Sequence, residues 1–194
     1  MIPELLELSQ NMIRALDRPF ERYFANKYSL NHRFAVITGS RGIGKSTLLV
    51  QQLQKHAGLD SNKILYLPVD HFLVQNYKIY DIAEKFYQQG GEWIAFDEIH
   101  RYEQWSMELK SICDTFQHLN ILASGSSALE IHKGSHDLSR RAIIYTMHGM
   151  SFREFINLSC ECAMPVFTLE DIMNKHGELA QFVLSMLPEK NRIL

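Results

Sequence analysis

The stretch Gly39-Ser40-Arg41-Gly42-Ile43-Gly44-Lys45-Ser46 follows the apolar run Phe34–Ile37 directly. It matches the pattern G-x-x-x-x-G-K-[ST], whose glycines let the backbone turn successive N–H groups toward a polyphosphate. A helix that begins near Gly44 adds the positive end of its dipole. Lys45 can then reach the β- and γ-phosphates, and the Ser46 hydroxyl can bind Mg²⁺. A glycine-rich turn with an incidental lysine is the alternative interpretation.

Short apolar segments alternate with segments of helical spacing on both sides of this loop. The apolar runs predict strands at 34–38, 64–67, 93–96, 121–123 and 142–145. The helical spacing predicts helices after the loop and at 79–89 and 104–116. Strands that are apolar throughout are typical of a parallel sheet buried on both faces. We therefore expect an α/β protein with three layers and a mostly parallel five-stranded sheet.

The two ends of the chain are predicted to be helical. The expected organisation is a helical segment at 1–30, the nucleotide-binding core at 31–150 and a helical extension at 151–194. Ser151-Phe152-Arg153-Glu154 is a capping box that opens a helix. A last helix is expected from Thr168 to Leu187, strained near Gly177. This extension is a candidate for the start of a lid or of a truncated C-terminal domain.

The composition of the chain sets only broad limits on its function. The 194 residues are 46% hydrophobic and 22% charged with a formal net charge of −2, which gives no overall attraction to nucleic acid or membrane. A DNA-associated role through the stretch 132–141 is left open. No apolar run approaches the ~20 residues of a membrane-spanning helix, and the N-terminus does not resemble a signal peptide. The odd number of cysteines, three, favours a reducing compartment, the cytoplasm.

Asp97 and Glu98 follow the apolar strand 93–96. Acids at such a strand end face the edge of the sheet where open α/β folds bind their ligands. Asp97 is predicted to hold the Mg²⁺ that Ser46 binds, through the water shell of the ion, and Glu98 is predicted to take a proton from the attacking water. The alternative is that the two acids merely cap the next helix.

Two further groups are candidates for contact with the γ-phosphate. Ser124 and Ser126 follow the strand 121–123. A hydroxyl at this position can form a hydrogen bond with the γ-phosphate, or it can only cap the next helix. Arg140 and Arg141 precede the last strand and can supply a guanidinium, from the same subunit or across an interface. Solvent exposure without a role is the alternative for both arginines. Arg41 and Arg101 are weaker candidates of the same kind.

These motifs together resemble prokaryotic AAA+-like ATPases related to the archaeal-type and STAND ATPases, in which a C-terminal domain of unknown function follows the core. The resemblance covers about 31–158. The matching segments are Thr38–Thr47, Phe96–Ile99, Ala123–Ser127, Leu138–Arg141 and Ser151–Phe155. Arg140 and Gly149 stand where the group often has glycine and proline, which leaves open which arginine approaches a phosphate.

The resemblance implies a role for each matched residue. Lys45 and Ser46 correspond to Walker A, Asp97 and Glu98 to Walker B. Ser126 corresponds to the sensor and Arg141 to the group's arginine. The residues expected to bind nucleotide are Gly39, Ser40, Arg41, Gly42, Ile43, Gly44, Lys45, Ser46 and Thr47; those expected to act in catalysis are Glu98, Lys45, Arg141 and Ser126.

The predicted function is Mg²⁺-dependent binding and hydrolysis of ATP. Adenine is favoured by elimination, because the chain has no N-K-x-D motif for guanine. The alternative is a nucleotide-gated switch or binding module with little or no turnover. A small-molecule kinase is less well supported, because no acceptor site is recognisable. Expected partners are ATP or ADP, further copies of the chain in a homo-oligomer and a missing C-terminal output domain, with no membrane.

Overall fold

The computed structural model describes residues 3–28, 30–57, 60–126, 138 and 140–187. The chain divides into two compact units, Met1–Gly149 and Met150–Leu194. The first unit contains the sheet and the glycine-rich loop, and the described part of the second contains two helices. Among the described residues, no helix combines the length and the apolar character needed to cross a bilayer.

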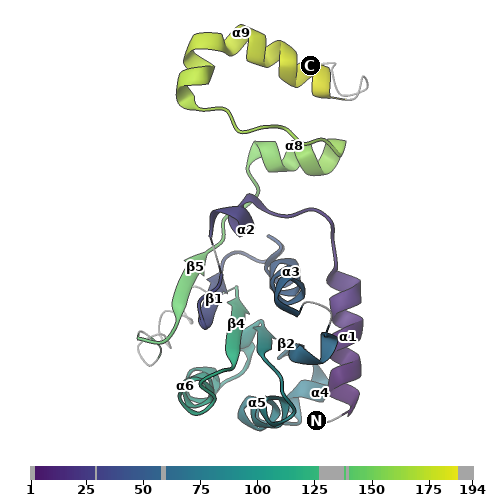
Figure 1. Cartoon of the computed structure of the whole chain (residues 1–194), viewed down its shortest axis with the longest axis vertical. Helices are drawn as coiled ribbons and strands as arrows, with labels where there is room; N and C mark the ends of the chain where they lie inside the picture. Colours follow the sequence, from purple (N-terminus) through teal and green to yellow (C-terminus); the bar gives the residue numbers. More distant parts are fainter. Residues whose placement is uncertain (1–2, 29, 58–59, 127–137, 139, 188–194) are drawn as a thin grey trace. The chain divides into compact units, whose positions relative to one another are not determined.

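The first unit is built on a five-stranded parallel sheet, which confirms the predicted fold class (Figure 1). The strand order is β2-β3-β4-β1-β5. The strands are β1 Phe34–Thr38, β2 Ile64–Pro68, β3 Trp93–Asp97, β4 Asn120–Gly125 and β5 Ile143–Thr146. Every residue of β1, β2 and β3 is buried, which explains why these segments carry no alternation of polar and apolar residues.

Helices cover both faces of the sheet and complete three layers (Figure 1). Helix α3, Lys45–Ala57, packs on the face that presents Ala35 and Ile37 of β1. Helices α5, Ile79–Gln88, and α6, Trp105–Thr115, pack on the opposite face. The alternation of side chains along each strand therefore divides the core into two apolar clusters.

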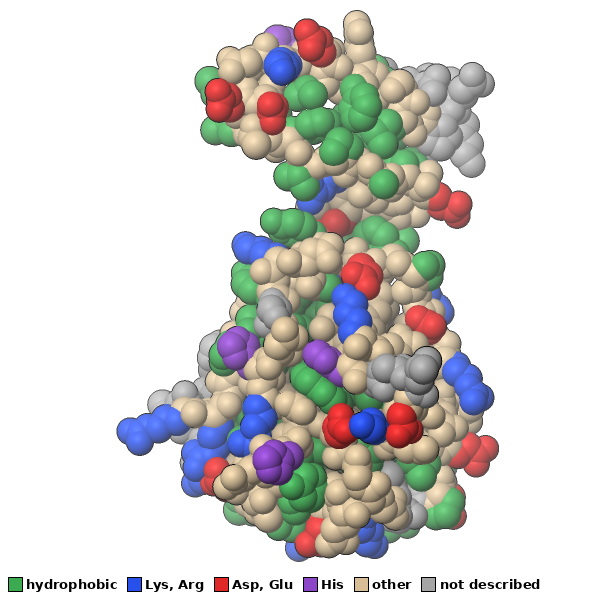
Figure 2. Space-filling view, in the orientation of Figure 1, with side chains coloured by type: hydrophobic (Ala, Val, Ile, Leu, Met, Phe, Trp, Pro, Cys, Tyr) green, Lys and Arg blue, Asp and Glu red, His purple; other side chains and the backbone are tan. Residues whose placement is uncertain are grey.

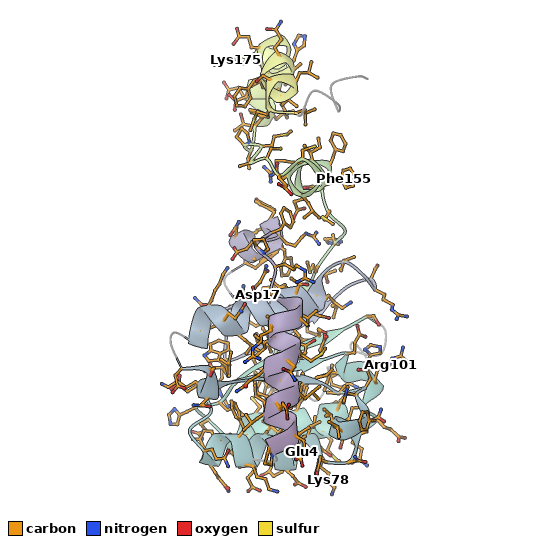
Figure 3. All side chains as sticks on the ribbon, turned by 90° about the vertical axis from the view of Figure 1, so that its right-hand side faces the viewer. Glu4, Asp17, Lys78, Arg101, Phe155 and Lys175 are labelled. Carbon is orange, nitrogen blue, oxygen red and sulfur yellow. The ribbon has the colours of Figure 1, made fainter. Side chains whose placement is uncertain are left out.

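Helix α1, Pro3–Leu16, lies beside the edge strand β2 (Figure 1), and Figure 3 shows this helix from the outside, between the labels of Glu4 and Asp17. Leu5 is fully buried, as the amphipathic pattern predicts. The Ser9 hydroxyl accepts a hydrogen bond of 2.8 Å from the backbone N–H of Tyr66, and both groups are buried. This contact satisfies a donor that a free edge strand would expose to other chains.

Shorter elements connect the main ones. They are α2 Tyr23–Lys27, η1 Ser61–Lys63, α4 Phe72–Gln75 and η2 Ile99–Arg101. The 3₁₀ turn η2 follows β3 directly and thereby sets the path of the chain after Asp97.

The second unit contains α8, Phe152–Cys160, and α9, Leu169–Met186. The predicted capping box opens α8: the Glu154 N–H donates to the Ser151 hydroxyl at 3.2 Å, and the Ser151 N–H donates to the Glu154 carboxylate at 2.8 Å. Helix α9 departs from helical geometry at Lys175, two residues before Gly177, around which the sequence predicted a break or strain. Hydrophobic side chains gather on the surface of this unit, among them Phe155 and Met173 (Figure 2).

Candidate functional site

The carboxyl ends of the strands bring the predicted motifs to one edge of the sheet. Thr38 of β1 pairs with Gly125 of β4 and with Thr146 of β5. Asp97 ends β3, whose Phe96 pairs with Ala123. The glycine-rich loop, the Asp97-Glu98 pair and the serines after β4 therefore all leave the sheet at the same edge, as the sequence predicted.

The conformation of the loop requires its glycines. Gly39, Gly42 and Gly44 have φ values of +151°, +80° and +96°, which L-residues with a side chain rarely adopt. A Cβ on Gly39 would also collide with the backbone oxygen of Met147. The Met147 N–H donates to the Thr38 carbonyl at 2.8 Å, so the loop starts in contact with the segment that follows β5.

Lys45 begins α3, and its side chain is buried at the loop. Its ammonium donates to the Gly39 and Ser40 carbonyl oxygens, each at 3.0 Å, and lies 3.9 Å from a Glu98 carboxylate oxygen. Charge-assisted bonds to phosphate oxygens are stronger than bonds to neutral carbonyls. The ammonium is therefore already placed where a bound polyphosphate can take over its hydrogen bonds.

Asp97 is buried and is held from both neighbouring strands. One carboxylate oxygen accepts a hydrogen bond of 2.5 Å from the Tyr66 hydroxyl, and the other accepts one from the Ser124 hydroxyl. Burial, followed by the charge of Asp97 and the hydrogen bond to it, raises the pKa of Tyr66 far above its usual value, and a hydrogen bond with Ser46 lowers it in part. Tyr66 therefore stays a protonated donor to Asp97, one of the two predicted metal ligands.

The donor set fits Mg²⁺. A hydroxyl and a carboxylate are hard oxygen ligands, which Mg²⁺ prefers, and this ion usually takes only one or two protein ligands beside water and substrate phosphates. Within the described residues, no group of three or more His, Cys, Asp or Glu side chains forms a dedicated metal cluster. Ser46 and Asp97 would hold the ion.

Glu98 has a left-handed backbone conformation, with φ +53° and ψ +40°. Its N–H donates to the Ser124 hydroxyl at 3.2 Å, and its carboxylate accepts a hydrogen bond of 3.2 Å from Ser126. His100 Nε2 lies 3.5 Å from the same carboxylate and 3.1 Å from the Ser126 hydroxyl. Glu98 makes no side-chain cap on η2, so its strained conformation places the carboxylate in this cluster instead.

The family assignment follows from a comparison with known proteins. Residues 31–156 match the AAA_14 family, described as an AAA domain. The chain belongs to this family.

The chain is also similar to a relative in sequence and to solved structures in fold. The uncharacterized protein MJ1637 of Methanocaldococcus jannaschii is 32% identical over 162 residues, which cover 78% of this chain and 34% of that protein. The AAA_14 chain thus spans about a third of this relative's length. The S. cerevisiae Hsp104–ADP complex has a TM-score of 0.51 at 14% identity, covering 95% of this chain and 31% of that one. The C. elegans PCH-2 structure has a TM-score of 0.45 at 15% identity, covering 93% and 55%.

Arg22 was not predicted from the sequence, yet it contacts the loop of this AAA domain. Its side chain is buried, and its guanidinium donates to the Ile43 carbonyl at 2.5 Å and to the His148 carbonyl at 3.0 Å. It thereby links the loop to the segment after β5. An arginine in the polar stretch before α2 carries no local signal of such a contact, because both partners are distant in the sequence.

The structure does not bring Arg141 to the loop of its own AAA domain. Arg141 precedes β5, so it lies at the amino edge of the sheet, roughly 17 Å along the strand direction from Thr146 by the usual rise per residue. Its guanidinium forms two hydrogen bonds with Asp114 of α6, at 2.6 and 2.8 Å. This contact lowers the pKa of Asp114.

The other predicted arginines are exposed. They are Arg41, Arg101 and Arg140. Of the stretch proposed for DNA contact, 132–137 and 139 lie outside the described residues, as does Ser127.

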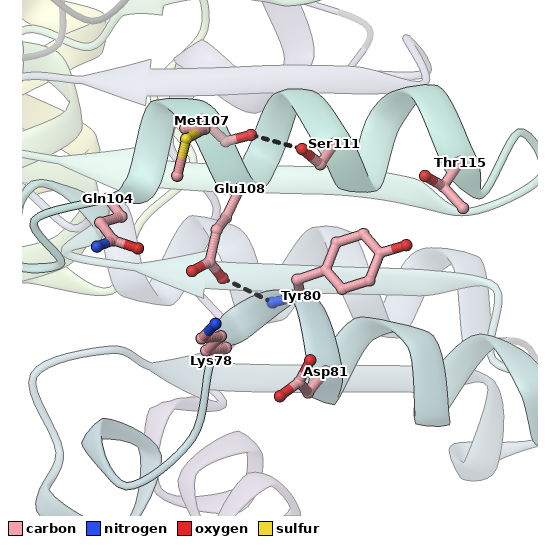
Figure 4. A pocket seen from close by; sticks show the side chains of 8 residues that line it. All are labelled: Lys78, Tyr80, Asp81, Gln104, Met107, Glu108, Ser111 and Thr115. Carbon is pink, nitrogen blue, oxygen red and sulfur yellow. Dashed lines mark hydrogen bonds between the residues drawn. The ribbon is translucent and has the colours of Figure 1, made fainter.

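A separate open pocket of about 490 Å³ lies between α5 and α6 (Figure 4). Its polar centre is the buried Glu108, which accepts hydrogen bonds from the Tyr80 N–H at 2.9 Å and from the Tyr102 hydroxyl at 2.7 Å. Burial, with the Glu108 hydrogen bond adding to it, raises the pKa of Tyr102 to about 12. Because Tyr80 is in the first turn of α5, Glu108 acts as a cap from a neighbouring helix, and its role is structural.

Proposed function

We propose that this AAA domain binds Mg²⁺–ATP at Gly39–Thr47 and hydrolyses it to ADP and phosphate. The observation that carries the proposal is the meeting of Lys45, Asp97 and Glu98 from separate elements at one sheet edge, with the Lys45 ammonium 3.9 Å from Glu98. The Hsp104 structure, which has a similar fold, is an ADP complex. Adenine in place of guanine is part of the proposal.

Each residue has a task in the proposed reaction. The loop N–H groups and the Lys45 ammonium bind the β- and γ-phosphates and orient them for in-line attack. Mg²⁺, when bound by Ser46 and Asp97, neutralises charge on the phosphate oxygens. Glu98 accepts the proton of the attacking water. Ser126 donates to the Glu98 carboxylate at 3.2 Å and would thereby hold it in place for this step.

Replacing Glu98 with Gln tests the hydrolytic step. Glutamine keeps the size and the hydrogen-bond acceptor but removes the base, so steady-state phosphate release should fall about a hundredfold or more. ATP affinity should stay within about threefold, because the phosphate contacts remain. Glu103→Gln, at an exposed acid nearby, is the matched control and should retain full turnover. Unchanged turnover in Glu98→Gln would remove Glu98 as the base.

A nucleotide-gated switch with little turnover is the second candidate. Arg22 favours it, because its two hydrogen bonds join the loop to His148, just before the second unit. Loss of the terminal phosphate would then shift a contact that reaches the connecting segment. Wild-type protein that binds ATP and ADP with different affinities, yet releases no phosphate at steady state, would favour this function over hydrolysis.

The proposal also covers the subgroup of ATPases, the domain organisation and the oligomeric state. We infer a relation to the STAND-type ATPases, a C-terminal output domain and assembly into a homo-oligomer in which Arg141 of one copy serves the site of another. The resemblance of Leu138–Arg141 and Ser151–Phe155 to that group supports these points.

A further inference from the structure

The hydroxyl of Tyr66 contacts Asp97, a predicted residue of the proposed metal site. Tyr66 lies in the middle of β2, and its side chain reaches Asp97 at the end of the neighbouring strand β3. A tyrosine hydroxyl has one proton to donate and two lone pairs to accept with. Its proton goes to Asp97 at 2.5 Å.

Both carboxylate oxygens of Asp97 are held by hydroxyl groups. One oxygen accepts from Tyr66 and the other accepts from Ser124. A carboxylate oxygen has further lone pairs, so these two bonds fix the orientation of the carboxylate and leave it able to accept from the water shell of a cation.

We propose that Tyr66 is a positioning residue of the Mg²⁺ site, whose hydroxyl orients Asp97 for the ion. The inference rests on the proposed function and adds a residue outside the loop and outside the Asp97-Glu98 pair. Partners of metal ligands typically change metal affinity by 10- to 100-fold when they are removed.

The hydroxyl is separable from the packing of the ring. Tyr66 is 1% exposed, and its ring belongs to the apolar cluster under α3, with Leu48 and Leu122. A phenylalanine ring fills the same volume and keeps these contacts. The strand itself is fixed by the bond from the Tyr66 N–H to Ser9, which does not involve the side chain of Tyr66. Tyr66→Phe therefore removes the hydrogen bond to Asp97 and leaves the fold.

The experiment measures ATP affinity by calorimetry in EDTA and across a Mg²⁺ series, for wild type and for Tyr66→Phe. In EDTA the two proteins should bind ATP within about twofold of each other. The gain in affinity that Mg²⁺ gives should fall about tenfold in the variant, with its midpoint at higher Mg²⁺. Tyr87→Phe, which removes the hydroxyl of a half-buried tyrosine packed on Phe116, is the matched control and should behave as wild type.

The outcomes separate this inference from the function on which it rests. Failure of the wild type to bind ATP in either condition overturns the proposed function. A wild type that gains affinity from Mg²⁺, with an equal gain in Tyr66→Phe, overturns the role of Tyr66 alone. An equal loss of affinity with and without Mg²⁺ also overturns it, because that pattern is what a general structural defect produces. Thermal unfolding of both variants in EDTA checks that the fold is retained.

Discussion

The Lys45 ammonium and the Glu98 carboxylate lie 3.9 Å apart, although the two residues belong to different elements of the fold. The lysine comes from the first turn of α3 and the glutamate from the turn after β3. A γ-phosphate that takes the ammonium as partner would bring its attacking water within reach of the carboxylate. In the proposed function, this short distance would connect the binding of the phosphate with its hydrolysis.

Gly39→Ala should destabilise the protein and abolish nucleotide binding. The new Cβ would overlap the Met147 backbone oxygen, and φ at this position is +151°. Backbone atoms cannot rotate away as a flexible side chain can, so we expect a loss of about 2 kcal/mol or more in the free energy of unfolding. Urea denaturation measures it. Gly149→Ala is the control, because a Cβ there meets nothing within 4 Å; equal stability of the two variants would contradict the packing described.

Glu108→Ala should lower the free energy of unfolding by about 1 to 3 kcal/mol without changing ATP affinity. The substitution removes the acceptor for the Tyr80 N–H at the start of α5 and for the Tyr102 hydroxyl. Urea denaturation and calorimetry measure the two quantities. Glu103→Ala, at an exposed site on the same stretch, should have little effect. A change in ATP affinity with unaltered stability would instead assign the pocket to the functional site.

Acidification should destabilise the protein through His56. Its ring stacks on Trp93 with centroids 3.8 Å apart, and burial, with the charge of Lys55 adding to it, lowers the pKa of His56 below 6.5. A lowered pKa in the folded state means that this contribution to stability is complete above pH 6.5 and falls as the pH drops below 6.5. Urea midpoints measured between pH 8 and 5 should decrease, and His56→Gln should flatten the dependence below pH 6.5. An unchanged slope in that variant would contradict the assignment.

Arg141→Ala should leave ATP binding intact and remove turnover, if the arginine acts on a neighbouring copy. Arg141 lies at the amino edge of its own sheet, far from its own loop. Mixing inactive Arg141→Ala with inactive Glu98→Gln should therefore restore part of the phosphate release, because some sites then combine an intact Glu98 with an intact Arg141. Mixtures that stay inactive would contradict an action across subunits. Arg140→Ala measures whether the neighbouring arginine takes this role.

Much of the fold could be predicted because buried parallel strands appear in the sequence as short apolar runs. The runs 34–37, 64–67 and 93–96 are almost wholly apolar, and the strands begin and end within one residue of these runs. The position of Asp97 and Glu98 at the loop edge follows from the same rule, since parallel strands have their carboxyl ends at one edge. The capping box at Ser151 was equally clear, because its partners are three residues apart.

Other features depend on pairings between distant segments. In the sequence alone, Tyr66 resembles an ordinary core tyrosine. Only the pairing of β2 with β3 brings its hydroxyl to Asp97. Arg22 contacts carbonyl groups far along the chain, which no local pattern indicates. The position of Arg141 was predictable, because a residue that precedes a parallel strand must lie at the amino edge. Its match to the family motif did not carry this geometric information.

The most direct test is calorimetry of wild type and Lys45→Ala with ATP and with ADP in excess Mg²⁺. Loss of the ammonium removes charge-assisted hydrogen bonds to the phosphates, so we expect affinity for ATP to fall by about a hundredfold. Lys55→Ala, at an exposed lysine of the same helix, should bind as wild type does. Saturable heat in the wild type and its loss in Lys45→Ala is the predicted result. A wild type that gives no heat with either nucleotide, or a Lys45→Ala variant that binds equally well, would contradict the account.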